Sequence, residues 1–213
     1  MGIYCFNRDT LIQALMEDAE DSSSSHDFGK NVVPRLVDKA RVYSYQFHDE
    51  NSKDAQYWRD IGTIEAYYEA NMDLTSVSPV FNLYDSHWPI RTYQRQYPPA
   101  KFVFAQEGRR MGIAMDSIVS SGCIISGGRV TSSILSPDVR VNSYTEIESS
   151  ILFAHVSVGR YSRIRRAIID RHIHLPEDTE IGFDLEEDRK KYHVTETGIV
   201  VVVPEQRMFE EPE

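Results

Sequence analysis

Aliphatic residues return at a fixed interval of seventeen positions through the second half of the chain, between Ile118 and Ile181. Four series show this interval: Ile134, Ile151 and Ile168; Val139, Val156 and Ile173; Val141, Val158 and Leu175; and Ile147, Ile164 and Ile181. The interval extends backwards from Val141 to Ile124 and from Ile147 to Val130, and the tetrapeptide SSIL begins at both Ser132 and Ser149. A repeat of this kind indicates a solenoid.

The length of the repeat indicates which solenoid to expect. Seventeen residues are too few for a helix-turn-helix repeat, but they suffice for three short strands, one on each face of a triangular prism. Small and polar turn residues separate the aliphatic positions, which we expect to point inward. We therefore predict a left-handed parallel β-helix of the hexapeptide type with roughly four coils. A sandwich of short strands is the alternative, but a sandwich has no reason to keep phase over four repeats.

The first half of the chain has a mixed pattern. Residues 1–6 (MGIYCF) are typical of a buried strand, and residues 41–47 (RVYSYQF) alternate like a second strand. Asp9 is expected to cap an amphipathic helix, and a short helix is expected near residues 32–39. The predicted fold is therefore an α/β segment at 1–75, an extended proline-rich linker at 76–112 and the β-helix with its tail at 113–213.

Composition narrows the possible partners and location. The formal net charge of −10 argues against nucleic acid and anionic membranes as partners. No apolar run is long enough to span a membrane, and no signal peptide is recognised. Cys5 and Cys123 lie far apart in apolar contexts, so we interpret them as core residues of a cytoplasmic protein and not as a disulfide or a metal pair.

Asp60 is the most suggestive acidic residue of the first half. It ends the extended segment YWRDI, just before Gly62 and before Thr63, which can cap a following helix. Anionic ligands bind at such strand-to-helix junctions in α/β proteins, and a carboxylate there can hold Mg²⁺. An aspartate two residues before a glycine is also a common turn or cap residue, and spacing alone favours that interpretation.

Several blocks of the sequence, in order, resemble one enzyme family. These blocks are MGIYCF, SSHDFGKNVVP, YWRDIGTIEAYYEANMDL, WPIRTY with PPAKFV, and VNSYTEIESSIL with IIDR. Together they are similar to the carboxy-terminal half of bacterial glucose-1-phosphate adenylyltransferase, the ADP-glucose pyrophosphorylase of glycogen synthesis. The resemblance extends to about Val203 and implies the end of a Rossmann-like nucleotidyltransferase domain followed by a left-handed β-helix, in agreement with the periodicity.

The resemblance implies the transfer of AMP from ATP to glucose 1-phosphate, giving ADP-glucose and pyrophosphate, with Mg²⁺ as cofactor and Asp60 as its ligand. It also implies a homotetramer in the complete enzyme. The family's glycine-rich nucleotide loop, its second metal-binding aspartate and its sugar-phosphate Glu-Lys pair would all precede Met1. We therefore expect this chain to supply the carboxy half of the enzyme and to be inactive alone.

Cationic residues gather near the end of the repeat region. They are His155, Arg160, Arg163, Arg165, Arg166, Arg171, His172 and His174, opposed by Asp170 alone. Such a cluster can bind a phosphorylated effector through guanidinium groups, although a solvated outer face with ion pairs is the favoured interpretation from the residues alone. The resemblance matches Arg171 to an arginine that binds an allosteric nucleotide or phosphate. Arg207 is the second effector candidate, because it lies near the tail position where some relatives carry arginines.

Two further interpretations stay open. His172 and His174 are two residues apart and are expected to share one face of a strand. No third ligand accompanies them, so we interpret them as surface polar residues and not as a metal site. A non-catalytic regulatory or scaffold β-helix that binds a phosphorylated effector is the alternative function. A β-helix acyltransferase is disfavoured, since the strict register leaves no room for the long inserted loop of that class.

Overall fold

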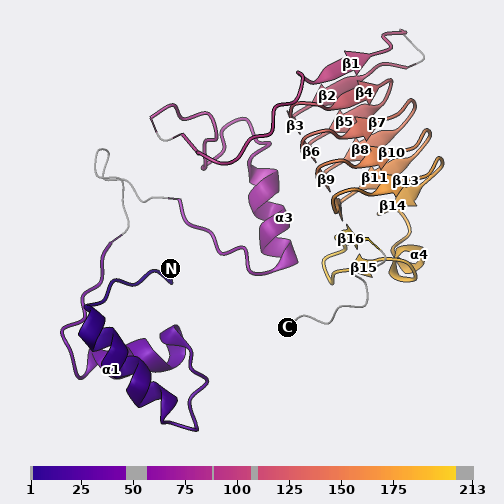
Figure 1. The fold of residues 1–213 in the computed structure, drawn as a ribbon. Coiled ribbons are helices and arrows are strands. Elements are labelled where there is room, and N and C mark those ends of the chain that lie inside the picture. Colours follow the sequence, from indigo (N-terminus) through magenta and orange to yellow (C-terminus); the bar gives the residue numbers. More distant parts are fainter. Residues whose placement is uncertain (1, 47–56, 88, 107–109, 205–213) are drawn as a thin grey trace. The chain divides into compact units, whose positions relative to one another are not determined.

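The computed structural model describes residues 2–46, 57–87, 89–106 and 110–204 (Figure 1). The chain packs as two compact units, Met1–Trp58 and Arg59–Glu213. The helix that follows Asp60 belongs to the second unit. The segment bounds expected from the sequence stay a prediction.

The first unit contains helix α1 (Arg8–Ala19), the π-helical turn η1 (Phe28–Val32) and the short helix α2 (Val33–Val37). Asp18 of α1 is only 3% exposed and connects these elements. Its carboxylate accepts a hydrogen bond from Ser24 Oγ at 2.7 Å, lies 2.8 Å from His26 Nδ1 and pairs with Arg35 at 3.4 Å. The hydrogen bond from Ser24, with His26 and Arg35, holds the pKa of Asp18 below its usual value.

Several predictions for the first unit are wrong. Residues 2–6 and 41–46 form no strand, and most of their side chains are exposed, including that of Cys5. A strand needs a neighbouring strand for its backbone groups, and the described part of this unit contains none. The cap of α1 is also misplaced, because the cap position is Asn7, whereas Asp9 lies in the first turn and pairs with Arg8 at 3.0 Å. The predicted short second helix is present as α2.

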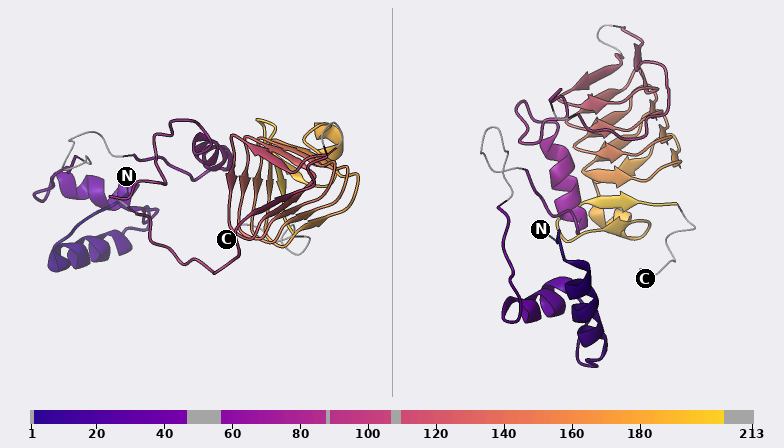
Figure 2. Two further views of the ribbon diagram at one scale, coloured as in Figure 1. Left: turned by 90° about the horizontal axis from the view of Figure 1, so that it is seen from above. Right: turned by 60° about the vertical axis from the view of Figure 1, so that its left-hand side comes forward.

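The second unit is a parallel β-helix, and its strands stack coil upon coil in Figures 1 and 2. Three sheets form its faces, in the orders β1-β4-β7-β10-β13, β14-β11-β8-β5-β2 and β15-β16-β12-β9-β6-β3. The pairing is parallel throughout except between β15 and β16. Strands β1 to β12 make four complete coils, as predicted, and β13 and β14 begin another.

The strand bounds are β1 Lys101–Val103, β2 Ile113–Met115, β3 Ile118–Val119, β4 Ile124–Ser126, β5 Arg129–Thr131, β6 Ile134–Leu135, β7 Arg140–Val141, β8 Glu146–Glu148, β9 Ile151–Leu152, β10 Ser157–Val158, β11 Arg163–Arg165, β12 Ala167–Ile169, β13 His174–Leu175, β14 Glu180–Ile181, β15 His193–Val194 and β16 Val200–Val202.

The register confirms the seventeen-residue repeat and corrects its first step. Ile134 pairs with Ile151 and Ile151 with Ile168, as the periodicity requires. Ile124, however, pairs with Arg140 and not with Val141, so this step is sixteen residues. The missing residue lies in the turn at Gly127 and Gly128, which is one residue shorter than the turns below it. A Cβ on Gly128 would lie 2.9 Å from the Asn142 carbonyl oxygen, so only glycine fits this tighter path.

Side chains alternate between the interior and the outer surface of the prism. The interior is a column of fully buried aliphatic residues, among them Ile125, Val141, Val130, Ile147, Leu135, Leu152 and Ile169. The predicted inward series Ile134, Ile151 and Ile168 instead lies on the outer side of the third face, where helix α3 (Ile64–Asp73) covers it. Figures 1 and 2 both show α3 lying along this sheet. Tyr68 of α3 is buried there and donates a hydrogen bond to the Ser149 carbonyl at 2.7 Å.

Each corner of the prism turns through a residue with positive φ, between +46° and +81°. The first corner has Gly122, Asp138, His155 and His172; the second has Gly127, Tyr144, Tyr161 and Asp178; the third has Asp116, Ser132, Ser149 and Arg166. Because the turns stack in register, residues far apart in sequence form columns along each corner. These columns bring together the polar side chains outside the core.

Buried serines connect the coils at the third corner, which explains the repeated SSIL. Ser150 is fully buried, and its Oγ accepts a hydrogen bond from the Ala167 N–H at 3.1 Å and donates one to the Glu148 carbonyl at 2.7 Å. Ser133 Oγ accepts from the Ser150 N–H at 3.1 Å in the same way. Each serine thus satisfies a backbone donor of the next coil.

Helix α4 (Leu185–Arg189) and the β15–β16 hairpin close the last coil. Asp184 caps α4 by accepting hydrogen bonds from the N–H groups of Glu186 and Glu187 at 3.1 and 3.2 Å. Asp188 is buried and accepts a hydrogen bond from the Gly182 N–H at 2.8 Å, and burial raises the pKa of its carboxyl. None of the helices in the described ranges is both long and apolar enough to cross a membrane.

The serine ladder can be tested by Ser150→Ala. The substitution leaves the Ala167 N–H buried without an acceptor, so we expect the β-helix to lose about 1–3 kcal/mol of unfolding free energy in urea denaturation. Ser78→Ala is the matched control, because Ser78 is exposed in the same unit. A loss in S150A no larger than that in S78A would contradict the ladder.

Candidate functional site

Asp60 lies in a turn directly before α3 and is exposed. Its Oδ1 accepts a hydrogen bond from the Gly62 N–H at 2.9 Å, and Thr63 Oγ1 then caps the helix by accepting from the Ala66 N–H at 3.2 Å. The predicted cap at Thr63 is confirmed, but residues 57–60 form no strand. Arg59 anchors the turn to α3 through Glu69 Oε2 at 3.0 Å and through Asp73.

This geometry gives Asp60 the turn role that spacing favoured, and it leaves the carboxylate able to bind a cation. Oδ1 is held by Gly62, whereas Oδ2 forms no hydrogen bond to any described residue. Mg²⁺ takes oxygen ligands and is often held by one or two carboxylates together with substrate phosphates. Residues 2–46, 57–87, 89–106 and 110–204 contain no group of three or more His, Cys, Asp or Glu side chains placed to hold a metal. The metal role of Asp60 stays a prediction.

Arg171 lies at the first corner, in the turn after β12, with a side chain that is 60% exposed. Asp170 fixes the start of this turn, because its Oδ1 accepts a hydrogen bond from the Arg171 N–H at 2.7 Å. The guanidinium Nε lies 3.8 Å from the same oxygen, which is too long for a strong ion pair. The guanidinium therefore keeps most of its donors for solvent or a ligand.

Two histidines stack beside Arg171. The rings of His155 and His172 lie 4.6 Å apart between centroids and 12° from parallel. His155 Nδ1 is 2.9 Å from Asp138 Oδ2, and Tyr97 Oη is 3.4 Å from His155 Nε2. His155, His172 and Arg171 border a cavity of about 370 Å³ that also touches Phe153 and Pro137. The corner therefore offers a small anion the Arg171 guanidinium and the His172 imidazole, whereas both ring nitrogens of His155 already face Asp138 and Tyr97.

The predicted cationic cluster is not one cluster. Only His155, Arg171 and His172 meet at the first corner, whereas Arg160 lies at the second corner and Arg166 at the third. Arg163 and Arg165 stand on the outer side of β11, where the solvated-face interpretation is confirmed for Arg163 by its ion pair with Glu180 at 3.0 Å. Cross-strand neighbours alternate in charge there, in the column Arg129, Glu146, Arg163 and Glu180.

The predicted pairing of His172 and His174 on one strand is wrong. His172 occupies the left-handed turn position with φ of 62°, and only His174 lies on β13, where it is exposed. Arg207 lies outside the described residues. Asp60 and Arg171 share no contact within the described ranges, and each is held by its own local partner.

Sequence reasoning missed the partners of Arg171. Gly122, Asp138, His155 and His172 recur at nearly the interval of the aliphatic series, so the same periodicity, applied to polar residues, would have found the column. The Asp18 network was also missed, because Ser22–Ser25 has the composition of a flexible loop although Ser24 binds a buried carboxylate.

Two protein families match this chain and define the class of protein to which it is similar. Residues 1–77 match the family described as nucleotidyl transferase, and residues 98–202 match the one described as GlmU-like, C-terminal hexapeptide. The chain therefore combines part of a nucleotidyltransferase domain with a hexapeptide β-helix, as predicted.

The particular family follows from similar curated proteins. Glucose-1-phosphate adenylyltransferase of Koribacter versatilis is 64% identical over 212 residues, which is 100% of this chain and 51% of that protein. The enzymes of the same name from Anaeromyxobacter dehalogenans and Rhodopirellula baltica are 57% and 55% identical over 95% of this chain, and the chain covers 50% and 46% of their lengths. The chain belongs to the glucose-1-phosphate adenylyltransferase family. It spans about half the length of the relatives it matches.

Proposed function

We propose that this chain forms the carboxy half of an enzyme that transfers AMP from ATP to glucose 1-phosphate, releasing pyrophosphate and ADP-glucose for glycogen synthesis. The observation that carries the proposal is the 64% identity to a glucose-1-phosphate adenylyltransferase across both segments of the chain. The described cysteines are free thiols, which is compatible with the cytoplasmic location expected from the sequence.

Within this proposal Asp60 is the metal ligand supplied by this half. A bound Mg²⁺ would neutralise charge on the phosphates of ATP while the sugar phosphate oxygen attacks the α-phosphorus in line. The contribution of this chain is positional: Gly62 fixes one oxygen of Asp60, and the ion pairs of Arg59 fix the turn to α3. The second oxygen is thus presented in one orientation beside the start of a helix, where the backbone N–H groups also favour anions.

The corner at Arg171 is the proposed effector site, and it would take a phosphorylated or nucleotide ligand. Supporting it are the exposed guanidinium, the His172 imidazole and the cavity of about 370 Å³ beside them. Arg207 remains a second candidate contact. A homotetramer is the proposed assembly of the complete enzyme.

The catalytic proposal is tested in the complete open reading frame that contains this chain, by assaying ADP-glucose formation with Asp60→Asn. Asparagine can keep the hydrogen bond to Gly62 but lacks the charge, so we expect kcat to fall by about 100-fold or more while α3 stays folded. Asp85→Asn is the matched control, because Asp85 Oδ1 also accepts a backbone hydrogen bond two residues on, from His87 at 2.8 Å. Near-normal turnover in D60N would contradict the proposed role of Asp60 in catalysis.

The effector site is tested by titrating this chain with inorganic phosphate and comparing Arg171→Lys with Arg163→Lys. Lysine keeps the charge but cannot make the two parallel hydrogen bonds of a guanidinium, so we expect phosphate affinity to fall about tenfold in R171K. The R163K control should bind like the parent chain, because Arg163 already pairs with Glu180 on a different face. Equal affinities in R171K and the parent chain would contradict the assignment.

A further inference from the structure

Helix α3 is held from two sides. The side chains that pack against the third sheet recur at helical spacing and form one face of the helix: Ile64, Tyr67, Tyr68 and Met72. On another face, Glu69 Oε2 lies 3.0 Å from the Arg59 guanidinium, which also pairs with Asp73. Because Arg59 directly precedes Asp60, the turn that carries Asp60 is fixed to α3, and α3 is fixed to the β-helix.

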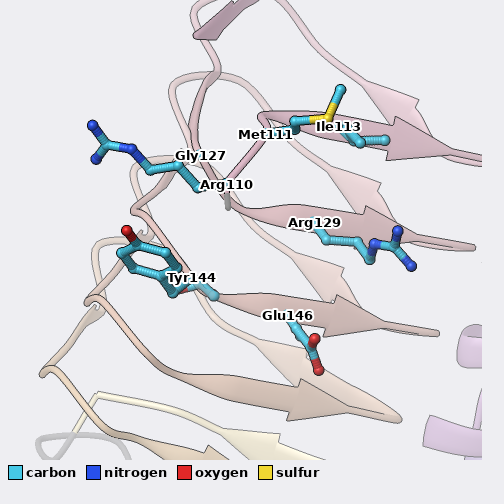
Figure 3. Close-up of a pocket in the computed structure, with 8 residues that line it drawn as sticks. Arg110, Met111, Ile113, Gly127, Arg129, Tyr144 and Glu146 are labelled. Atoms are coloured by element: carbon cyan, nitrogen blue, oxygen red, sulfur yellow. The ribbon is translucent and has the colours of Figure 1, made fainter. Parts of the chain in front are cut away.

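The third face of the β-helix is suited to receive this helix, whereas the second face is not. Figure 3 shows Arg129 and Glu146 on neighbouring strands of the second face, and Arg110 at its corner donates a hydrogen bond to Ser143 Oγ at 3.2 Å. An apolar helix face placed there would desolvate these charges. The third face instead presents an apolar outer column: Ile134, Ile151 and Ile168. The sequence of the outer columns therefore places α3 on the third face.

Tyr68 gives this contact its direction. Apolar burial alone is non-directional, so it would let α3 slide along the stacked coils. The Tyr68 hydroxyl donates a hydrogen bond to the Ser149 carbonyl at 2.7 Å, and the Arg166 guanidinium lies 5.5 Å from the centre of the Tyr68 ring. Ser149 and Arg166 are successive left-handed residues of the third corner, with φ of 46° and 51°. Two neighbouring coils therefore fix one phenol ring.

Hydrogen bonds connect the position of Tyr68 to that of Asp60. The N–H of the preceding residue, Tyr67, donates to the Thr63 carbonyl at 2.9 Å in the first turns of α3. Thr63 Oγ1 caps the helix, and the Gly62 N–H holds Asp60 Oδ1 at 2.9 Å. A displacement of α3 along the β-helix would thus displace the carboxylate as well. Misplacing a reacting group by about 1 Å can cost on the order of 100-fold in rate.

We propose that Tyr68 is a positioning residue for the nucleotidyl transfer, because its hydroxyl fixes α3 on the β-helix and thereby orients the Asp60 carboxylate for the cation. The inference rests on the proposed metal role of Asp60. Tyr68 acts through the turn at 60–63 and is not itself a metal ligand. The β-helix therefore takes part in the reaction as the support of a metal ligand, in addition to carrying the proposed effector site.

The position of the turn can be measured without catalysis, by NMR of this chain labelled with 15N-glycine. Tyr68→Phe removes the hydroxyl and keeps the ring, so we expect the Gly62 amide signal, assigned with Gly62→Ala, to shift and its heteronuclear NOE to fall. Ser150→Ala is the control, because it weakens the neighbouring coil and leaves the hydrogen bond of Tyr68 in place. A Gly62 signal that is unchanged in Y68F, or changed equally in S150A, would overturn the proposal.

The complete open reading frame supplies the second test, by assaying ADP-glucose formation against Mg²⁺ concentration. We expect Y68F to lower kcat about tenfold and to raise the Mg²⁺ concentration that gives half the maximal rate. S150A, assayed below the temperature at which it unfolds, should leave that concentration unchanged. A smaller folded fraction would lower the rate without changing the half-saturating Mg²⁺ concentration, so an unchanged value in Y68F would count against positioning.

The double variant separates this inference from the metal role of Asp60. If Tyr68 acts through Asp60, adding Y68F to D60N should cost little beyond D60N alone, because the two residues act as a unit. Independent, multiplicative losses would overturn the positioning role and leave the metal role standing. Near-normal turnover in D60N would overturn the metal role, and this inference with it.

Discussion

The hydrogen bonding between successive coils is the constraint on which the second unit depends. Strands that pair in parallel with a step of seventeen residues must close each coil at the same height, so the turns are forced into register as well. Three features keep the turns in register: the repeated residues with positive φ, the buried serines, and the glycine pair at residues 127 and 128. Replacing a side chain at one corner therefore changes the contacts of the residues stacked one coil above and below it.

The same constraint creates the polar sites. A turn by itself exposes one or two side chains, but stacked turns place members of different coils in contact, as His155 and His172 are at the first corner. The three corners differ because their columns differ: imidazoles and Arg171 at the first, tyrosines with Arg110 at the second, and buried serines under Tyr68 at the third. The interior is aliphatic except for the buried Cys123, and Tyr192 packs against it.

Periodicity predicted the β-helix because one physical signal, the inward alternation of aliphatic residues, recurs without interruption. It could not distinguish inward from outward columns where both are apolar, which is why Ile151 was expected in the interior although it packs under α3. The first half was harder to predict, because residues 2–6 have the composition of a strand but the described part of their unit contains no strand for them to pair with. Asp60 was placed before a helix by its neighbours Gly62 and Thr63, whereas its proposed metal role rests on family resemblance.

Native-state hydrogen exchange of the whole chain would test the central claim that the in-register coils form a self-sufficient folded unit. The account predicts strong amide protection through β4 to β12 and in the buried turn of α3 around Tyr68. It also predicts protection at least about 100-fold weaker in residues 2–46, where only short helices hold the backbone. Comparable protection in the two units would contradict the claim, because the in-register coils would then give the second unit no greater stability than the first unit has.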